Sequence, residues 1–388
     1  MKQDISRLVY ISAGEPDFKQ AHSIQTFYTC KYLRNFFPVE IVYPLTIGSL
    51  AKKYKFDSYQ KNRIIVKRLP ATSFGRIAAF FHLPGWAKNT FFLADRILYS
   101  ILVRLCYVFS RDTIFFSRDT IASLFIRKPI VELHSLEHLE TNSLEKLTEN
   151  LEKKTLYKAE SLITITKGLK SLIEDRYGLH CHVVPDAYEP SIFDNLPEKS
   201  HARKLLGIKK RSRLVVFSGL KLAEKGADIL IRSAKFIPDV DVYIVGGGKE
   251  EIDFLGRMAE KLGARNVELV GRVGQKLVAL YLAASDVLVL PYPSNIRNEI
   301  FTSPLKLFEY MSCRRPIVAT SVGSLTEVLG EKDAVFVTPG NPKALAEGIK
   351  RAFTGEGNEN AERLYRKRHL FTYRQRAKKI ARIIKNRK

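Results

Sequence analysis

The chain has 388 residues, of which 45% are hydrophobic and 27% are charged. This balance is typical of folded proteins and excludes a disordered chain, and the length exceeds what one hydrophobic core organises. Lys and Arg number 64 against 40 Asp and Glu, a formal net charge of +24. Such an excess indicates anionic partners, namely phosphorylated substrates, anionic lipid or nucleic acid; a surface tuned for solubility is the alternative.

The cysteines and the apolar stretches indicate in which cellular compartment the protein is found. The four cysteines are far apart, without a C-x-x-C pair or metal-ligand spacing, which favours free thiols in a reducing environment. The residues after Met1 do not form the apolar part of a secretory signal, and the most apolar stretch, 97–109, contains Arg104 and is too short to span a bilayer. We therefore expect a cytoplasmic protein, with attachment to the inner face of the cell membrane left open.

Short β-rich runs alternate with helical patterns in the first half of the chain, an order that favours an α/β architecture with a parallel sheet. The predicted strands are Leu8–Ile11, Glu40–Tyr43, Ile64–Val66, Thr113–Phe116, Ile130–Leu133, Leu162–Thr164 and Val183–Val184. The predicted helices are 20–36, 91–109, 141–157 and 167–176.

A polar stretch with three prolines, 185–197, reads as a linker, after which the alternation restarts with nearly continuous apolar strands typical of a sheet buried on both faces. The predicted strands are Leu214–Ser218, Val242–Val245, Val267–Val270, Val287–Leu290, Ile317–Ala319 and Val335–Val337. The predicted helices are 226–236, 249–262, 275–284, 304–312, 324–329 and 342–353. We thus predict one domain over 1–187 and a second over 188–362.

The last segment, 363–388, has 12 Lys or Arg and no acidic residue, and its apolar residues follow a helical spacing. It predicts one basic amphipathic helix, which could pack back on the first domain.

The most informative segment is 302–311, TSPLKLFEYM. Ser303 is a favourable N-cap and Pro304 suits the first helical position, so the free amides and positive end of this helix would bind an anion. Lys306 lies in the first turn, with Glu309 three residues later on the same side. One interpretation places a nucleotide diphosphate at the amides and its ribose at Glu309; the other is an ordinary capped helix with a surface ion pair.

Two glycine loops support the first interpretation. The segment 217–226, FSGLKLAEKG, follows a predicted strand and brings Lys225 within reach of a phosphate, and 245–248, VGGG, ends the next strand. Because the carboxyl ends of parallel strands meet at one edge of a sheet, these loops predict a ligand crevice there.

In this order, the segments SGLKLAEKG, IVGGGKE, VELVGRV, ASDVLVLP and SPLKLFEYMSCRRPIVAT resemble the retaining glycosyltransferases of family 4, also called group 1, with the GT-B fold. In the first half, 12–14 with 21–25 resembles the N-terminal glycine loop and first helix of that family, and 117–119 and 131–135 resemble later signatures. The resemblance implies two Rossmann-like domains that face each other across a cleft. The first would bind the acceptor and the second the nucleotide-sugar.

The resemblance also implies roles for residues of the second domain. Lys225 matches the lysine that holds the donor diphosphate, and Glu309 matches the carboxylate that binds the ribose. Gly219 lies in the glycine loop, and Thr302 and Ser303 match the loop over the phosphates and the sugar.

In the first domain, His134 matches the histidine that contacts the transferred sugar, and Gly14 would lie near the donor sugar or the acceptor. The resemblance thus assigns the catalytic roles to His134 and Glu309.

Two positions depart from the family. The glutamate expected eight residues before Glu309 is Phe301, and Glu299 is out of register with it. The arginine expected after Gly219 is Leu220, so that Lys221 supplies the missing charge or the contact is absent.

The implied reaction moves a hexosyl-type sugar from a nucleotide diphosphate-sugar donor to an acceptor, a lipid-linked or cell-envelope glycan, with retention of configuration. Lys225, with Lys221 or Lys306 and the helix amides, would absorb the charge of the leaving group, so we expect neither a metal nor a cofactor besides the donor. The triplet 239–241 copies a metal-binding DxD motif but falls where a turn is expected before a strand.

The positive charge of the first half has two interpretations. Aromatic residues of 74–92 are interleaved with Arg76 and Lys88 and follow a basic group that includes Lys52, Lys53 and Lys55. This composition suits a protein that lies on an anionic membrane, and a helix packed into the core with solvated lysines is the alternative.

Two other functions remain open. A pI near 9.8 fits a nucleic-acid-binding protein, but we find no helix-turn-helix, zinc-finger or RNA-recognition pattern and expect no nucleic acid. The same fold could also host a nucleotide-sugar epimerase or a sugar phosphorylase, which differ in the product they form.

Overall fold

The structure is a computed structural model that describes residues 7–14, 16, 20–46, 56–110, 112–139, 144–209 and 213–387. The chain divides into two compact units. The first consists of Met1–Pro185 together with Arg376–Lys388, and the second of Asp186–Gln375. The sequence predicts a boundary after residue 187, and the structure divides the chain after Pro185.

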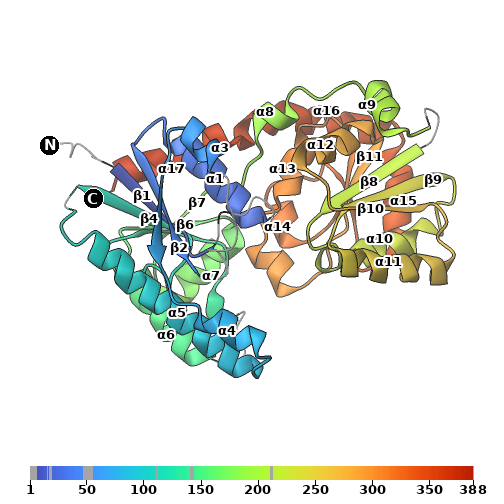
Figure 1. Ribbon diagram of the computed structural model, residues 1–388. Helices are drawn as coiled ribbons and strands as arrows, with labels where there is room; N and C mark the ends of the chain where they lie inside the picture. The colour runs from blue at the N-terminus through green and yellow to red at the C-terminus, as the bar shows by residue number, and fades with distance from the viewer. Residues whose placement is uncertain are drawn as a thin grey trace. The chain divides into compact units, whose positions relative to one another are not determined.

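In the described part of the first unit, seven parallel strands form one sheet in the order β3-β2-β1-β4-β5-β6-β7, with helices on its faces (Figure 1). The strands are β1 (Arg7–Ile11), β2 (Val39–Leu45), β3 (Ile65–Pro70), β4 (Thr113–Ser117), β5 (Ile130–Leu133), β6 (Ser161–Thr164) and β7 (Cys181–Val183). The helices are α1 (Ala21–Leu33), α3 (Asp57–Lys61), α4 (Phe74–Phe80), α5 (Gly85–Cys106), η1 (Glu137–Leu139), α6 (Glu145–Lys158) and α7 (Lys167–Tyr177).

The described residues of the second unit form a six-stranded parallel sheet in the order β10-β9-β8-β11-β12-β13. Its strands are β8 (Arg213–Gly219), β9 (Val240–Gly246), β10 (Val267–Gly271), β11 (Val287–Leu290), β12 (Ile317–Thr320) and β13 (Val335–Val337). The helical elements are α8 (Pro190–Phe193), α9 (Lys199–Leu206), η2 (Ala223–Lys225), α10 (Ala227–Ala234), α11 (Lys249–Leu262), α12 (Gln275–Ala284), η3 (Arg297–Phe301), α13 (Leu305–Met311), α14 (Gly323–Thr326), α15 (Pro342–Ala352), α16 (Gly355–Lys367) and η4 (Arg368–Phe371). The last helix, α17 (Tyr373–Lys385), runs into the first unit.

The two sheets confirm the predicted α/β class, and their strand orders fix where ligands can bind. In the first sheet β1 pairs with β2 on one side and β4 on the other, so the chain reverses direction across the sheet at β1. In the second sheet β8 pairs with β9 and β11 in the same way. In open parallel sheets the crevice lies at the carboxyl ends of these central strands. Gly14 follows β1, and Gly219 ends β8.

Local signals account for the accuracy of several predicted elements. The predicted helices 249–262 and 275–284 agree with α11 and α12 to the residue, and β11 and β13 agree with their predicted strands. At α15, the Asn341 side chain accepts a hydrogen bond from the Ala344 amide, and Pro342 occupies the first turn, the residue types that such positions favour. Of the predicted helix 141–157, residues 141–143 lie outside the described part of the chain.

The prediction of one continuous helix over 363–388 is wrong. Helix α16 ends at Lys367, and the extended Thr372 separates η4 from α17. The break is stabilised by pairing: the Tyr188 amide donates to the Phe371 carbonyl, and the Tyr373 amide donates to the Tyr188 carbonyl. Periodicity did not reveal this break because the apolar residues on both sides of it keep a helical spacing.

Helix α17 is part of the core of the first unit (Figure 1). Ala377, Ile380, Ala381 and Ile384 are buried among residues of β1, α1 and β2. Among the helices in the described ranges, none is long and apolar enough to cross a bilayer.

Gly226 allows a test of how closely the backbone segments after β8 and β11 pack at the carboxyl edge of the second sheet. Its φ is +84°, and a Cβ there would lie 1.9 Å from the Pro291 carbonyl oxygen. Gly263 also has a positive φ, +66°, but a Cβ there would meet nothing within 4 Å. We expect Gly263→Ala to lower the free energy of unfolding by about 1 kcal/mol, the cost of the left-handed conformation. Gly226→Ala should lower it by about 3 kcal/mol or more because the backbone must also move.

Urea unfolding followed by circular dichroism measures both losses. Equal losses in the two variants would show that the approach of Pro291 to Gly226 does not constrain the fold.

Candidate functional site

Lys306 is the most unusual residue at the carboxyl edge of the second sheet. Its ammonium lies 4.2 Å from the centre of the Phe217 ring and 5.3 Å from that of Tyr292. The nitrogen is buried and has no hydrogen-bond partner among the described residues. Burial, followed by the charge of Lys225, holds the pKa of Lys306 well below its usual range. The site therefore contains a lysine that lacks a counterion.

Lys225, the last residue of η2, lies close to Lys306, and we call these two residues and their neighbours the lysine cluster. The Lys225 ammonium donates to Asn298 Oδ1 at 2.9 Å and to Thr302 Oγ1 at 3.4 Å, and it lies 4.8 Å from the centre of the Tyr292 ring. Both acceptors are neutral, so they orient the ammonium without cancelling its charge. Burial, with a smaller effect of nearby Arg297, lowers the pKa of Lys225 to about 8.

Glu309 is the carboxyl group nearest this pair in the predicted motif. It lies one turn after Lys306 on α13, and Gln275 Nε2 donates to its Oε1 at 3.4 Å. Burial raises the pKa of Glu309 to about 7, although Gln275 and Lys306 act in the opposite direction. A carboxyl group held this way can accept hydrogen bonds from hydroxyl groups of a ligand while it is ionised.

Glycines leave room for the lysine side chains of this cluster because they lack a Cβ. A Cβ at position 219 would lie 2.6 Å from Lys306 Nζ, so a side chain there would displace the ammonium. Gly246 has a φ of +117°, and a Cβ there would lie 1.8 Å from the Gly219 carbonyl oxygen. The Gly247 amide donates to that same oxygen at 3.1 Å. The two glycine loops predicted from the sequence are thus in direct contact.

The structure corrects the predicted start of the helix. Helix α13 begins at Leu305, Pro304 takes the cap position, and no side chain caps the amides. The Ser303 hydroxyl instead accepts a hydrogen bond from the Asp186 amide at 3.0 Å. A serine cap failed here because the backbone amide of Asp186 competes for the same oxygen.

The structure does not bring Lys221 into the cluster. Its ammonium lies 3.0 Å from Glu224 Oε1 in an exposed ion pair. Phe301 is buried, and Glu299 accepts hydrogen bonds from the Gly323 amide at 2.6 Å and the Ser294 hydroxyl at 2.8 Å. Glu299 therefore links η3, which precedes α13, to the start of α14.

His134 follows β5 in the first unit and is bound to a buried carboxylate. Its Nε2 lies 2.6 Å from Glu132 Oε1, and Arg376 of α17 donates to Glu132 Oε2 at 2.7 Å. Burial would raise the pKa of Glu132, but Arg376 and His134 outweigh it and hold this pKa well below its usual range. Burial, then the charge of Arg118, lowers the pKa of His134 to about 4. At neutral pH the ring is therefore uncharged, and its Nε2 carries the proton that faces Glu132.

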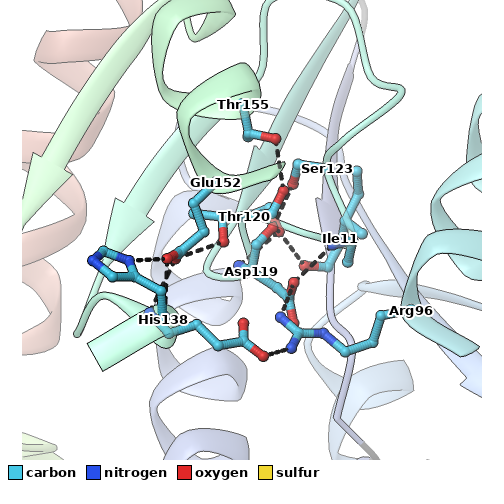
Figure 2. A network of polar contacts seen from close by, with 11 residues as sticks. Ile11, Arg96, Asp119, Thr120, Ser123, His138, Glu152 and Thr155 are labelled. Carbon is cyan, nitrogen blue, oxygen red and sulfur yellow. Dashed lines mark hydrogen bonds and ion pairs between the residues drawn. The ribbon is translucent and has the colours of Figure 1, made fainter. Parts of the chain in front are cut away.

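Gly14 borders a cavity of about 320 Å³ in the first unit. A Cβ at this position would lie 2.5 Å from His22 Nε2. Arg96 forms another part of the wall and pairs with Asp119 and Glu137 (Figure 2). Figure 2 also shows Glu152 accepting from Thr120 and from His138, which joins α6 to this network.

Several residues of the second-unit cluster gave no sequence signal. Asn298 and Gln275 contribute neutral amides, and Phe217 and Tyr292 contribute aromatic rings. Phe217 and Tyr292 belong to or follow apolar strands, where an aromatic residue predicts core packing and nothing more. In the described part of the chain, no group of three or more His, Cys, Asp or Glu is placed to hold a metal ion.

Comparison with known proteins gives a family for part of the chain. The family described as Glycosyl transferases group 1 matches residues 211–354, the range that contains Gly219, Lys225, Lys306 and Glu309. An uncharacterized glycosyltransferase of Methanocaldococcus jannaschii is 28% identical over 240 residues, which cover 58% of this chain and 55% of that protein. The chain spans about half the length of the curated relatives it matches first.

Solved structures match over nearly the whole chain. A sucrose-phosphate synthase from Thermosynechococcus elongatus has a TM-score of 0.75 at 16% identity and covers 98% of each chain. HepE from Anabaena, solved with UDP and glucose, has a TM-score of 0.71 at 17% identity and covers 98% of this chain and 99% of its own. WaaG, a glycosyltransferase involved in lipopolysaccharide biosynthesis, has a TM-score of 0.70 at 14% identity and covers 98% of this chain and all of its own.

Identities this low show the fold alone, and that fold is the predicted GT-B architecture of two Rossmann-like units. The family match falls on the unit that carries the lysine cluster. Residues 211–354 therefore match the family described as Glycosyl transferases group 1, within a chain that has the GT-B fold.

Proposed function

We propose that the protein is a retaining hexosyltransferase, which moves a hexosyl-type sugar from a nucleotide diphosphate-sugar donor to an acceptor. The observation that carries the proposal is the pair formed by Lys306, which has no counterion, and Lys225, which has only neutral partners. This pair lies at the carboxyl edge of the second sheet, beside Gly219. A diphosphate is the ligand class whose charge and size suit two neighbouring ammonium groups.

A buried ammonium without a counterion is unfavourable, and the lowered pKa values of both lysines express that cost. A bound dianion would reverse it by favouring the charged form of each lysine. The same lysines would then stabilise the diphosphate as it leaves, when its negative charge increases. Lys306 thus takes the part that an arginine after Gly219 would otherwise play, and neither a metal nor a further cofactor is required.

Glu309 is proposed to bind the ribose hydroxyls. Its position one turn after Lys306 places a hydrogen-bond acceptor next to the diphosphate site. The loop of Thr302 and Ser303 would cover the phosphates and the sugar, and the backbone at Gly219 would allow their close approach.

In the first unit, His134 is proposed to contact the transferred sugar, and Gly14 to border the acceptor. His134 is uncharged at neutral pH and fixed by Glu132, so it would orient a sugar hydroxyl without adding charge. In the reaction, the bond between the anomeric carbon and the diphosphate oxygen breaks. The bond to the acceptor oxygen forms on the same face, which retains the configuration.

The proposed acceptor is a lipid-linked or cell-envelope glycan, reached at the inner face of the cell membrane. Among proteins of similar fold, WaaG, which is involved in lipopolysaccharide biosynthesis, supports the envelope-glycan acceptor. HepE, solved with UDP and glucose, supports the nucleotide-sugar donor. The net charge of +24 suits a phosphorylated donor and an anionic membrane surface.

Substitution of the two lysines tests the proposal. Lys306→Met should preserve or raise stability, because methionine fits among Phe217 and Tyr292 and removes an uncompensated charge. The same change should lower transfer about 100-fold, as should Lys225→Met, because each removes a cation from the leaving group. Glu309→Gln should weaken donor binding. Release of nucleotide from UDP-, GDP- and ADP-sugars with a mixed lipid-acceptor extract measures transfer, and thermal unfolding measures stability.

Lys332→Met is the matched control, since Lys332 is exposed on the same unit. Transfer at the wild-type rate by both Lys225→Met and Lys306→Met would refute the site. A product that is an epimerised donor or a sugar phosphate would refute glycosyl transfer while keeping the donor site.

The affinity for nucleoside diphosphate should depend on pH. Because the pKa of Lys225 is about 8 in the free protein, this lysine loses its proton as the pH rises from about 7 to about 9, whereas a bound diphosphate favours its charged form. Binding should therefore take up a proton, and the affinity should fall about tenfold per pH unit above the pKa. Calorimetry with UDP in buffers of different ionisation enthalpy measures both effects.

Lys225→Arg serves as the control, because its guanidinium stays charged throughout this range and should flatten the profile. A wild-type affinity that is constant between these pH values would contradict the role of Lys225.

A further inference from the structure

Helices α4 and α5 of the first unit expose a group of apolar residues that we call the α4–α5 patch. Its most exposed members are Phe80, Phe81 and Trp86, which are 77%, 67% and 64% exposed. Phe74, Ile77, Leu83, Phe91 and Phe92 complete it. Single exposed apolar residues are ordinary, but eight on one pair of packed helices indicate an interaction surface. Among them the Phe74 ring lies next to that of Phe91, and the Phe80 ring next to that of Phe81.

The helices are fixed, so this exposure is built into the fold. The Asp95 carboxylate of α5 accepts hydrogen bonds from the amides of Phe74 and Gly75 at 3.1 and 2.9 Å, at the start of α4. A Cβ at Gly75 would lie 2.5 Å from the Phe92 ring, which shows how closely the helices pack. Figure 1 shows α4 against the N-terminal end of α5, at one end of this unit.

The charge around the patch is positive. Residues 74–109 contain four basic residues and one acidic residue, Asp95. Asp95 is occupied by backbone amides, and Arg96 is paired with Asp119 and Glu137. Lys88, two residues after Trp86, is left to face an anionic partner, whereas Arg104 lies near the far end of α5. Lys52, Lys53 and Lys55, which the sequence adds to the basic group, lie outside the described residues.

Aromatic and aliphatic side chains with flanking cations are the chemistry that binds the surface of an anionic bilayer. A second copy of this chain would instead need to offer a complementary acidic surface, and this chain carries a net charge of +24. The charge therefore favours a membrane over self-association as the occupant of the patch.

The cavity beside Gly14 shares its wall with these helices. Arg76 of α4 and Phe92, Asp95, Arg96 and Tyr99 of α5 line it. Its other side is formed by residues after β1, in β2 and after β3, namely Ala13, Gly14, Pro44, Thr46, Ala71, Thr72 and Ser73, together with Gln20 and His22. Phe92 thus belongs both to the exposed patch and to the polar cavity.

We propose that the α4–α5 patch inserts into the surface of an anionic membrane and that the cavity receives the polar head of a lipid-linked acceptor whose tail stays in the bilayer. This inference rests on the proposed function, which it deepens by giving the acceptor its chemical class and its entry. The cavity volume of about 320 Å³ suits one small polar head.

Trp86 makes the insertion directly measurable, because it is the single tryptophan of the chain. Vesicles of phosphatidylcholine and phosphatidylglycerol should shift its emission to the blue, and brominated lipid in the same vesicles should quench it. High salt should weaken the effect, since the flanking cations act through charge. An unchanged emission with these vesicles would overturn the proposal. A blue shift that instead follows protein concentration without vesicles would also overturn it, because it would show self-association through the patch.

Substitutions separate the patch from its matched control. Phe80→Ser with Phe81→Ser keeps the Trp86 reporter and should weaken vesicle binding about 100-fold, because two aromatic side chains no longer leave water. Phe254→Ser, at a 51% exposed aromatic of α11, should not change it. Equal losses in both variants would mean that binding is not specific to the patch.

The cavity is tested separately by Thr72→Trp, which fills it. This variant should keep vesicle binding and UDP affinity but lose transfer to a lipid-linked acceptor; retained transfer would overturn the acceptor assignment. Vesicle binding and UDP binding are independent measurements. A protein that binds UDP but no vesicles therefore refutes this inference alone, and one that binds vesicles but no nucleotide refutes the proposed function.

Discussion

The second unit is organised around an ammonium group that its own side chains do not neutralise. Lys306 lies between two aromatic rings that offer only the weak attraction of their faces. Gly219 lacks a side chain at the point where the ammonium lies, and Lys225 adds a second charge instead of cancelling the first. A protein that retains such a residue gives up stability at that point, and an anionic ligand can recover it.

In the first unit, by contrast, the buried charge has a partner of opposite sign. Arg376 pairs with Glu132 and neutralises its charge within the unit, and the uncharged His134 donates a hydrogen bond to the same carboxylate. The consequence is a histidine held in one orientation and one protonation state. Arg376 comes from the last helix, α17, which explains why the end of the chain belongs to the first unit. A paired charge in the first unit fixes the orientation of His134, whereas the unpaired charge of Lys306 in the second unit leaves a site for an anionic ligand.

The candidate site could be predicted only where a residue type in a particular place has a chemical meaning. Lys225, Lys306 and Glu309 stand after strands or in the first turns of a helix, and their spacing indicated an anion site. Asn298 and Tyr292 could not be found in this way, because an amide in a polar loop and an aromatic after an apolar strand are common everywhere. At Ser303 the expected role did not occur: this favourable cap residue does not cap α13, because its hydroxyl accepts a hydrogen bond from the amide of Asp186, 117 positions away in sequence.

The sequence by itself determined the two parallel sheets, since apolar runs of strand length that alternate with amphipathic helices have few other ways to be buried. It also determined that cations gather near the glycine loops. Only the tertiary structure decided which of these cations lack a counterion. Lys221 forms an ion pair with Glu224, whereas the ammonium of Lys306 contacts aromatic rings. Periodicity describes which face of a helix is apolar, but desolvation and pairing depend on neighbours that are distant in the chain. For the same reason, the sequence left open whether the aromatic residues of 74–92 pack in a core, and only the tertiary structure shows that those of the α4–α5 patch are exposed.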